Sequence, residues 1–218
     1  MVTLIIPDVH LKYSKLLSLE PKMEEADRVV FLGDFFDAFT AEPNAVKLIT
    51  TWLLGNLWNP KYTFLFGNHD HHYMSKSTGF SSGYDLETQK LLDAEMSQDA
   101  WRRFKVWTEV GPFVVSHAGF CHETIHFKDQ AETAIEAAFQ NKFHPLWQAG
   151  WSVGGKERWG GPTWLRWWEL EDVGFKQIVG HTIVKAPEKD KHGNWNLDTN
   201  LRNIAWVDEE GNLTIEAV

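Results

Sequence analysis

Five short segments of the sequence hold side chains that bind metal ions in many proteins, and each follows a run of apolar residues. They are Asp8-Val9-His10, Gly33-Asp34-Phe35-Phe36-Asp37, Gly67-Asn68-His69-Asp70, His117-Ala118-Gly119 and Gly180-His181-Thr182. Imidazole and carboxylate ligands suit Mn²⁺, Fe or Zn²⁺. Two such ions about 4 Å apart, bridged by a carboxylate, can generate a hydroxide nucleophile between them. Because Cys121 is the only cysteine, a site built from several thiolates is excluded.

Each segment alone has an ordinary explanation. Asp-x-His occurs by chance, Gly-Asn-His-Asp can be a simple turn, and single histidines at strand ends are usually hydrogen-bonded core residues. Five such segments in this order, each after a strand, make coincidence the weaker explanation. The neighbouring glycines fit tight turns, where the backbone needs positive φ or close approach.

The elements that must position these segments are strands that alternate with helices. Apolar runs predict strands at 2–7, 28–32, 62–66, 104–109, 113–116, 177–180, 195–197, 203–207 and 213–217. Helical patterns cover 42–57, 85–101 and 130–143. This order predicts an α/β fold with sheet at its core. Ligands of open α/β sheets bind beyond the carboxyl ends of strands, so the five segments should meet in one cleft.

Length and composition are those expected of a soluble globular protein. The 218 residues are 43% hydrophobic, and 21 Lys and Arg against 30 Asp and Glu give a net charge of −9. That length predicts a single domain over 1–218. No apolar run approaches the ~18 residues of a membrane span, and the N-terminus lacks the basic start of a signal peptide. We therefore expect a cytoplasmic protein without a membrane partner, and the acidic charge disfavours a nucleic-acid polymer as partner.

The five segments resemble the signature blocks of the calcineurin-like metallophosphoesterases. Those blocks are Asp-x-His, Gly-Asp-x-x-Asp, Gly-Asn-His-Asp/Glu, His-Ala/Gly-Gly and Gly-His-Thr, and the likeness runs from about residue 4 to about residue 216. The single histidine of the last block, with Trp164-Leu165-Arg166 before it and Leu197-Asp198-Thr199 after it, is similar to the PPP-type branch. That branch includes phage and bacterial protein phosphatases and symmetrical diadenosine tetraphosphate hydrolases. The resemblance implies a four-layer α/β/β/α sandwich of two mixed sheets flanked by helices.

The resemblance also implies cofactors and a role for each matching residue. Two divalent metal ions would be bound, with Mn²⁺ as first choice and Fe or Zn²⁺ as alternatives. Asp34 would bridge them, and the full ligand set would be Asp8, His10, Asp34, Asn68, His117 and His181. The bridging hydroxide would attack phosphorus while His69 protonates the leaving group. Asp37 would hold and polarise His69, and Arg166 would grip the substrate phosphate.

The sequence departs from the branch directly after Asp37. The branch usually carries Arg-Gly there, whereas this chain has Ala38-Phe39, so one phosphate-gripping arginine is missing. That loss counts against a protein phosphatase. Arg102, Arg103 and Arg158 are candidates to replace it. Asp70 in place of Glu, and Asn200 in place of the Gly of Asp-Thr-Gly, are changes that we expect to be tolerated.

A Trp- and Gly-rich stretch at about 144–168 is expected to form an insertion or lid. Six of the twelve tryptophans fall there: Trp147, Trp151, Trp159, Trp164, Trp167 and Trp168. They could pack the stretch down, the favoured alternative, or one of them could stack on a nucleobase or aryl group of a substrate.

Residues next to the third and fourth blocks receive no role. We expect His71 and His72 at the cleft rim or in solvent, and residues 74–83 as a surface loop near the cleft. His122 and His126 are not expected to bind metal, because no carboxylate partner is evident.

The predicted function is a metal-dependent phosphoesterase that acts on a small phosphate ester or nucleotide. A serine/threonine protein phosphatase is the alternative within the same chemistry. A non-catalytic metal-binding interaction module is the alternative from another class, and its expected mark would be degraded ligand positions, which this chain does not have. The sequence identifies neither partner proteins nor the oligomeric state.

Overall fold

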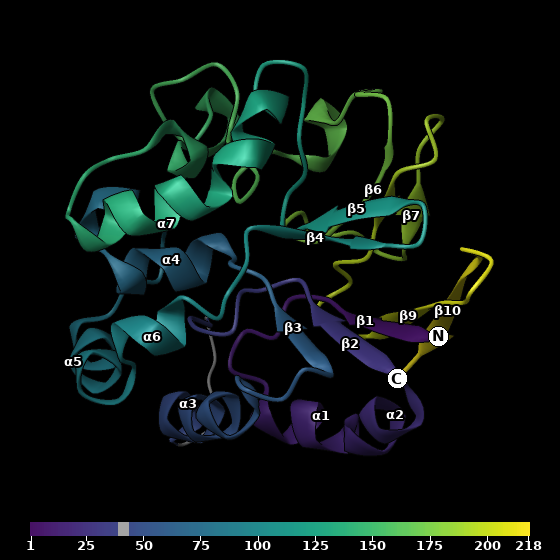
Figure 1. Cartoon of the computed structure of the whole chain (residues 1–218), viewed down its shortest axis with the longest axis horizontal. Helices are drawn as coiled ribbons and strands as arrows, with labels where there is room; N and C mark the ends of the chain where they lie inside the picture. Colours follow the sequence, from purple (N-terminus) through teal and green to yellow (C-terminus); the bar gives the residue numbers. More distant parts are fainter. Residues whose placement is uncertain (39–43) are drawn as a thin grey trace.

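The strands form two mixed five-stranded sheets in the computed structural model, which describes residues 1–38 and 44–218 (Figure 1). The first sheet has the order β10–β9–β1–β2–β3. Its strands are β1 (Thr3–Ile6), β2 (Arg28–Phe31), β3 (Tyr62–Phe64), β9 (Asn203–Val207) and β10 (Leu213–Ala217). Strands β1, β2 and β3 run parallel, whereas β9 is antiparallel to both β1 and β10.

The second sheet has the order β4–β5–β6–β8–β7. Its strands are β4 (Trp107–Val110), β5 (Phe113–Ser116), β6 (Lys176–Val179), β7 (Glu188–Lys189) and β8 (Trp195–Asn196). Strands β5, β6 and β8 run parallel, and β4 and β7 are antiparallel edges. Gly111, at φ +54°, turns the β4–β5 hairpin in a conformation that glycine adopts without strain.

The two sheets pack face to face through one apolar cluster. Ile5 and Val30 of the first sheet meet Val115 and Ile178 of the second, and all four side chains are fully buried. Side chains alternate along a strand, so Leu4, beside Ile5, points to the opposite face and joins the helices. Burial on both faces explains why these strands are continuous apolar runs in the sequence.

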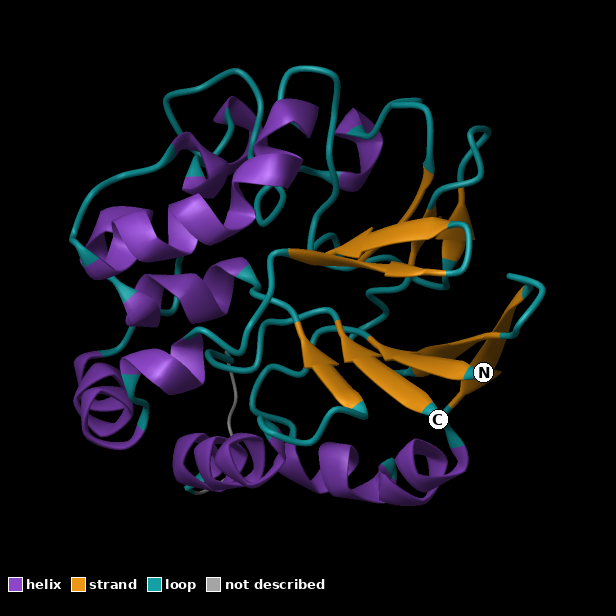
Figure 2. Cartoon of the chain, in the orientation of Figure 1, coloured by secondary structure: helices purple, strands orange, loops and turns teal. Residues whose placement is uncertain are grey.

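Helices cover the outer face of the first sheet and gather beside both sheets. The first group is α1 (Tyr13–Ser18), α2 (Glu20–Glu25) and α3 (Ala45–Asn56), which lie under the first sheet (Figure 2). The second group is α4 (Asn68–Met74), α5 (Leu86–Glu95), α6 (Gln98–Trp101) and α7 (Ala131–Phe139). On the second sheet, Val179 packs under Leu165 and Leu170, from a stretch that includes a 3₁₀ helix at Trp167–Glu169. The predicted sandwich of two mixed sheets with flanking helices is confirmed.

Most differences from the expected elements lie in the helices, but the short strand β7 was not expected either, and the strand expected at 104–109 begins only at Trp107. The helix expected over 85–101 is interrupted where Met96 is extended and Ser97 caps α6 through its side chain. The expected helix start at Glu42 lies outside the described residues. The short helices α1 and α2 were not expected from the sequence, and the helix expected over 130–143 ends at Phe139. Among the described helices, none has the length and apolar character that crossing a bilayer requires.

Candidate functional site

The five segments converge at the carboxyl ends of β1, β2, β3, β5 and β6. Two groups of potential ligands form there, and within each group one ligand atom per residue lies within 4.8 Å of the others. The groups are Asp8, His10 and Asp34, and Asp34, His117 and His181. The Oδ1 atom of Asn68 completes the second group, at 3.1 Å from His117 Nε2 and 2.8 Å from His181 Nδ1. The structure therefore brings all six expected ligands together, with Asp34 common to both groups.

The hydrogen bonds of two histidines determine which ring nitrogen faces Asp34. The Nδ1 atom of His10 lies 2.9 Å from the carbonyl oxygen of Asp37, and that of His117 lies 2.8 Å from the carbonyl oxygen of Leu32. A carbonyl only accepts, so Nδ1 carries the proton in both rings. Their Nε2 lone pairs then face Asp34 Oδ2 at 3.5 and 3.4 Å. The lone pairs of these two Nε2 atoms and of the Asp34 carboxylate therefore face one another, and a cation between them fits this arrangement.

The site is also rich in buried negative charge. Asp8, Asp34 and Asp198 are at most 2% exposed. Burial raises the pKa of Asp8, and Asp198 and Asp34 raise it further. The Oδ1 atom of Asp8 and the Nε2 atom of His181 are buried and have no hydrogen-bond partner among the described residues. Burial lowers the pKa of His117 and of His181, which keeps both rings neutral. Divalent cations fit this donor set, because they balance the carboxylates and accept neutral imidazole.

Four of the candidate residues hold a left-handed backbone conformation. The φ angles are +46° at His10, +51° at Asp34, +60° at Asp37 and +64° at His181. Each costs roughly 1–3 kcal/mol for a non-glycine residue, and such strain concentrates at functional sites. Gly67 allows a further close approach, because a Cβ there would overlap the Asp34 carboxylate. The backbone of this region is shaped around its polar side chains at a cost in stability.

Asp70 anchors the loop that carries Asp34 to the start of α4. Its carboxylate accepts hydrogen bonds from the backbone N–H groups of Asp34 (2.7 Å), Phe35 (2.8 Å), Phe36 (3.4 Å) and Gly67 (2.9 Å). Burial and the neighbouring Asp34 raise the pKa of Asp70, and these N–H groups oppose the rise. Aspartate, which is shorter than the glutamate also found at this position of the block, therefore reaches the Asp34 loop and Gly67 from the first turn of α4.

We expect Asp70→Ala to destabilise the protein by about 3 kcal/mol or more, because each buried N–H left without a partner costs roughly 1–3 kcal/mol. Urea unfolding of the metal-free protein measures this loss. Asp85→Ala is the matched control, since the Asp85 side chain caps α5 by accepting from Thr88 N and its loss should cost about 1 kcal/mol. Equal losses for the two variants would contradict the anchoring role of Asp70.

His69 and Asp37 form a close pair beside the candidate ligands. His69 Nδ1 lies 2.9 Å from Asp37 Oδ2, and the His69 ring is 5.2 Å from the ring of His10. Burial alone would lower the pKa of His69, but Asp34 and Asp37 outweigh it and raise the pKa. Burial likewise opposes ionisation of Asp37, yet its contacts with His69, His72 and Tyr73 lower its pKa. The pair thus joins a carboxylate that ionises more readily to an imidazole that holds its proton more strongly.

The expectation that His71 and His72 lie at the rim or in solvent is wrong, because both side chains are fully buried. The Gly67-Asn68-His69-Asp70 block begins helix α4, so the following residues turn inward. His72 Nε2 lies 3.0 Å from Asp37 Oδ2, and the Tyr73 hydroxyl donates to Asp37 Oδ1. His71 packs on Trp147 with ring centroids 4.9 Å apart. The i, i+3 spacing of His69 and His72 could have indicated a shared helix face.

Arg166 interacts electrostatically with His181, a member of the second ligand group. Burial and then His117 account for most of the lowered pKa of His181, and Arg166 lowers it further, which places the guanidinium within electrostatic reach. Its Cζ lies 6.0 Å from the ring of Trp168, and it has no ion pair with a carboxylate in the described part of the chain. Arg166 is therefore available to an anion at the site.

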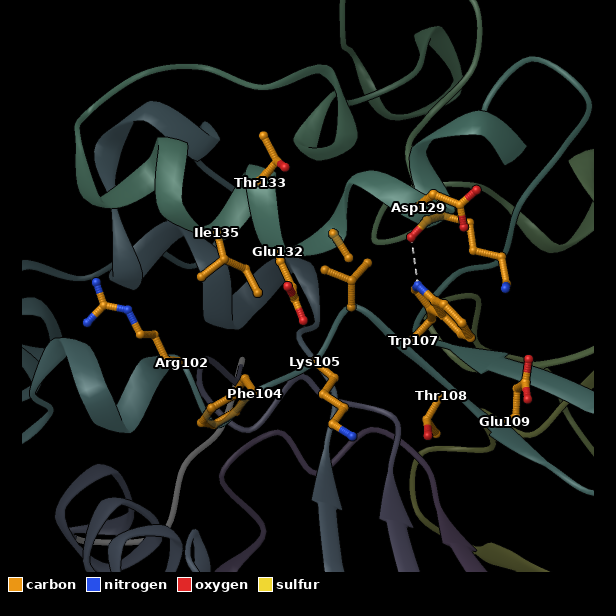
Figure 3. A pocket seen from close by; sticks show the side chains of 13 residues that line it. Arg102, Phe104, Lys105, Trp107, Thr108, Glu109, Asp129, Glu132, Thr133 and Ile135 are labelled. Carbon is orange, nitrogen blue, oxygen red and sulfur yellow. Dashed lines mark hydrogen bonds between the residues drawn. The ribbon is translucent and has the colours of Figure 1, made fainter.

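Of the expected substitutes for the missing arginine, Arg102 and Arg158 are engaged elsewhere. Arg102 is bonded to Glu136 and Asp99, and it lines a groove of about 660 Å³ beside β4 and α7 (Figure 3). The described residues that line this groove include none of the six candidate ligands. The guanidinium of Arg158 lies 5.0 Å from the ring of Trp159.

The third candidate substitute, Arg103, lies over the ring of Trp58 at 5.7 Å. The guanidinium groups of these three arginines thus have other contacts.

The tryptophans of the 144–168 stretch divide into buried and exposed ones. Trp147 is 1% exposed and its Nε1 donates to the carbonyl of Ala134, while Trp164 is 8% exposed and 6.0 Å from the His181 ring. Trp151 and Trp168 are 65% and 70% exposed. Packing therefore accounts for at least Trp147 and Trp164, and movement of this stretch as a lid stays a prediction.

Comparison with known proteins identifies the family. The model of the calcineurin-like phosphoesterase family matches residues 1–185. The chain belongs to this family. Calcineurin-like phosphoesterases are metal-dependent, and the two groups that share Asp34 supply candidate ligands. No curated protein matches the chain in sequence.

Solved structures share the fold at low sequence identity. A cold-active protein-tyrosine phosphatase of a psychrophilic Shewanella species is 15% identical, with a TM-score of 0.63 over 98% of this chain and 80% of its own. A protein serine/threonine phosphatase from Saccharomyces cerevisiae is 18% identical, with a TM-score of 0.57 over 99% and 79%. A putative diadenosine tetraphosphatase is 15% identical, with a TM-score of 0.54 over 99% and 93%. These likenesses support the fold.

Proposed function

We propose that this calcineurin-like phosphoesterase hydrolyses a small phosphate ester or nucleotide with two divalent metal ions. The observation that carries the proposal is the pair of ligand groups that share the buried Asp34 carboxylate. Mn²⁺ is the first choice, and Fe or Zn²⁺ fit the same donor set. When bound, two such ions supply a hydroxide nucleophile and stabilise charge on the phosphoryl oxygens. The ligands would be Asp8, His10 and Asp34 for one ion and Asp34, Asn68, His117 and His181 for the other.

His69 is the proposed proton donor to the leaving oxygen. Its Nδ1 proton is directed at Asp37 Oδ2, so Nε2 is the nitrogen that can protonate the leaving group. The raised pKa of His69, to which Asp34 and Asp37 contribute, keeps the imidazolium populated towards neutral pH. Asp37 orients the ring and stabilises its charge, as a carboxylate does for a general acid.

Arg166 is the proposed phosphate-binding residue, and Arg166→Ala is expected to lower kcat/KM by roughly 10- to 100-fold. A charge-assisted hydrogen bond to phosphate contributes about 1.5–3 kcal/mol, and 1.4 kcal/mol corresponds to a factor of ten. Steady-state kinetics with p-nitrophenyl phosphate measure the effect. Arg158→Ala is the control, because its guanidinium lies over Trp159. Wild-type kinetics in Arg166→Ala would contradict the role.

Two observations favour a small substrate over a phosphoprotein. Ala38 stands where the branch carries a phosphate-gripping arginine, and Arg102 and Arg158, two of the expected substitutes, are held at other contacts. The net charge of −9 also disfavours a polynucleotide. A protein phosphatase remains the alternative, since solved structures with this fold include protein phosphatases as well as a putative diadenosine tetraphosphatase.

Hydrolysis by metal-stripped protein reloaded with Mn²⁺ tests the proposal. The substrates are p-nitrophenyl phosphate, bis-p-nitrophenyl phosphate, diadenosine tetraphosphate and a phosphoserine peptide, with Asp34→Ala as control. Metal-dependent turnover of one of the first three, absent from the control, is the expected result. Turnover of the peptide alone would favour a protein phosphatase. Two bound metals without any turnover would favour the non-catalytic binding module.

A further inference from the structure

Residues that follow α4 fold back against the Asp37–His69 pair. We propose that Ser81 and His72 are positioning residues that hold this pair in the geometry for proton donation, an inference that rests on the proposed function. Ser81 Oγ lies 2.7 Å from His72 Nδ1, 3.3 Å from His69 Nδ1 and 3.2 Å from the carbonyl oxygen of Asn68. One hydroxyl thus contacts both histidines that flank Asp37. Ser81 is 7% exposed, so water has little access to these contacts.

The backbone of Ser81 fixes the tautomer of His72. The Ser81 N–H group, which can only donate, points at His72 Nδ1 at 3.1 Å. Nδ1 therefore carries a lone pair, and the proton of the neutral ring lies on Nε2. This Nε2 atom is 3.0 Å from Asp37 Oδ2. Ser81 thereby keeps the proton of neutral His72 on the ring nitrogen that contacts the same carboxylate oxygen as His69.

Asp37 is then held at both carboxylate oxygens. Oδ2 lies between His69 Nδ1 at 2.9 Å and His72 Nε2 at 3.0 Å, while Oδ1 accepts from the Tyr73 hydroxyl. Donors on both oxygens oppose rotation of the carboxylate about its χ2 torsion. The direction of the Asp37–His69 hydrogen bond, and with it the orientation of the His69 ring, is therefore fixed by its neighbours.

The rest of the segment closes over this arrangement. Gly83, at φ +99°, passes so near that a Cβ there would lie 3.2 Å from Asp37 Cβ. The ring of Tyr84 stacks on that of Tyr73 with centroids 5.4 Å apart, and the backbone N–H of Asp85 donates to the Tyr73 hydroxyl at 3.1 Å. The expectation of a plain surface loop at 74–83 is therefore wrong at Ser81, which is buried against the pair.

The test compares leaving groups in the Mn²⁺-loaded enzyme. Phenolate needs a proton as it leaves, whereas 2,4-dinitrophenolate does not, so loss of positioning should slow only phenyl phosphate. We expect Ser81→Ala and His72→Phe to lower kcat for phenyl phosphate by about tenfold or more. Turnover of 2,4-dinitrophenyl phosphate should stay within about twofold of wild type. Ser81→Thr, which retains the hydroxyl, should restore phenyl phosphate turnover.

Ser82→Ala is the matched control, because Ser82 is the same residue type in the next position and is exposed. Equal slowing of both substrates by Ser81→Ala and His72→Phe would overturn the inference, since it would indicate a general structural role. The inference would also be overturned if Ser81→Ala and His72→Phe had the same kinetics as Ser82→Ala.

His69→Ala separates failure of the inference from failure of the proposed function. A wild-type enzyme that hydrolyses neither phenyl substrate refutes the phosphomonoesterase activity and the inference with it. If His69→Ala slows phenyl phosphate more than 2,4-dinitrophenyl phosphate but the Ser81 and His72 variants do not, the inference is refuted and the proposed function is not.

Discussion

Asp34→Asn is expected to empty at least one metal site and to abolish metal-dependent hydrolysis. The Asp34 Oδ2 atom lies 3.5 Å from His10 Nε2 and 3.4 Å from His117 Nε2, so this carboxylate belongs to both ligand groups. Asparagine keeps the shape but loses the charge and one acceptor oxygen, and it cannot bridge two ions. Loss of a partner that only supports a ligand costs roughly 10- to 100-fold, so loss of a shared ligand should exceed 100-fold.

Metal content after dialysis, measured beside phosphate release, checks this expectation. Asp129→Asn is the control, because Asp129 is an exposed acid on the separate groove beside β4 (Figure 3). Near-ultraviolet circular dichroism of both variants verifies that the fold persists. Two metal ions retained by Asp34→Asn would show that the two groups do not share a bridging ligand.

The positions of the candidate ligands could be predicted because they depend on strand ends. Strands buried on both faces give apolar runs that end clearly, as at Ile6 and Phe31, and parallel strands bring their carboxyl ends to one edge. Asp8 and Asp34 therefore meet although 26 positions separate them in the sequence. Predicting the positions of Asp8 and Asp34 required no knowledge of side-chain geometry.

The surroundings of Asp37 could not be predicted in the same way. The inward position of His72 depends on α4, a helix of seven residues that is too short for a periodic pattern to reveal. Ser81 reaches His69 only because residues 75–84 fold back onto that helix, and this contact is long-range packing that no local pattern encodes. The short helices α1 and α2 were missed for the same reason of length.

His69→Ala is expected to lower turnover by about 10²- to 10⁴-fold and to leave the metal content unchanged. The His69 side chain is directed at Asp37 and belongs to neither ligand group. Its backbone N–H donates to Asp34 Oδ1 at 2.9 Å, and the substitution preserves that bond. His69→Ala should therefore lose turnover but keep its metal ions, whereas Asp34→Asn should lose both. Apo protein after His69→Ala would refute the assignment of roles.

Asp37→Asn tests the same pair through its pH dependence. Asparagine tolerates the φ of +60° at this position, so the backbone should not change. Asp37 helps to raise the pKa of His69, and removing its charge lowers that pKa. The protonated form of His69 is then lost at a lower pH, which moves the alkaline limb of the profile of kcat against pH to lower pH. An alkaline limb at the wild-type position in Asp37→Asn would show that His69 is not the group that protonates the leaving oxygen.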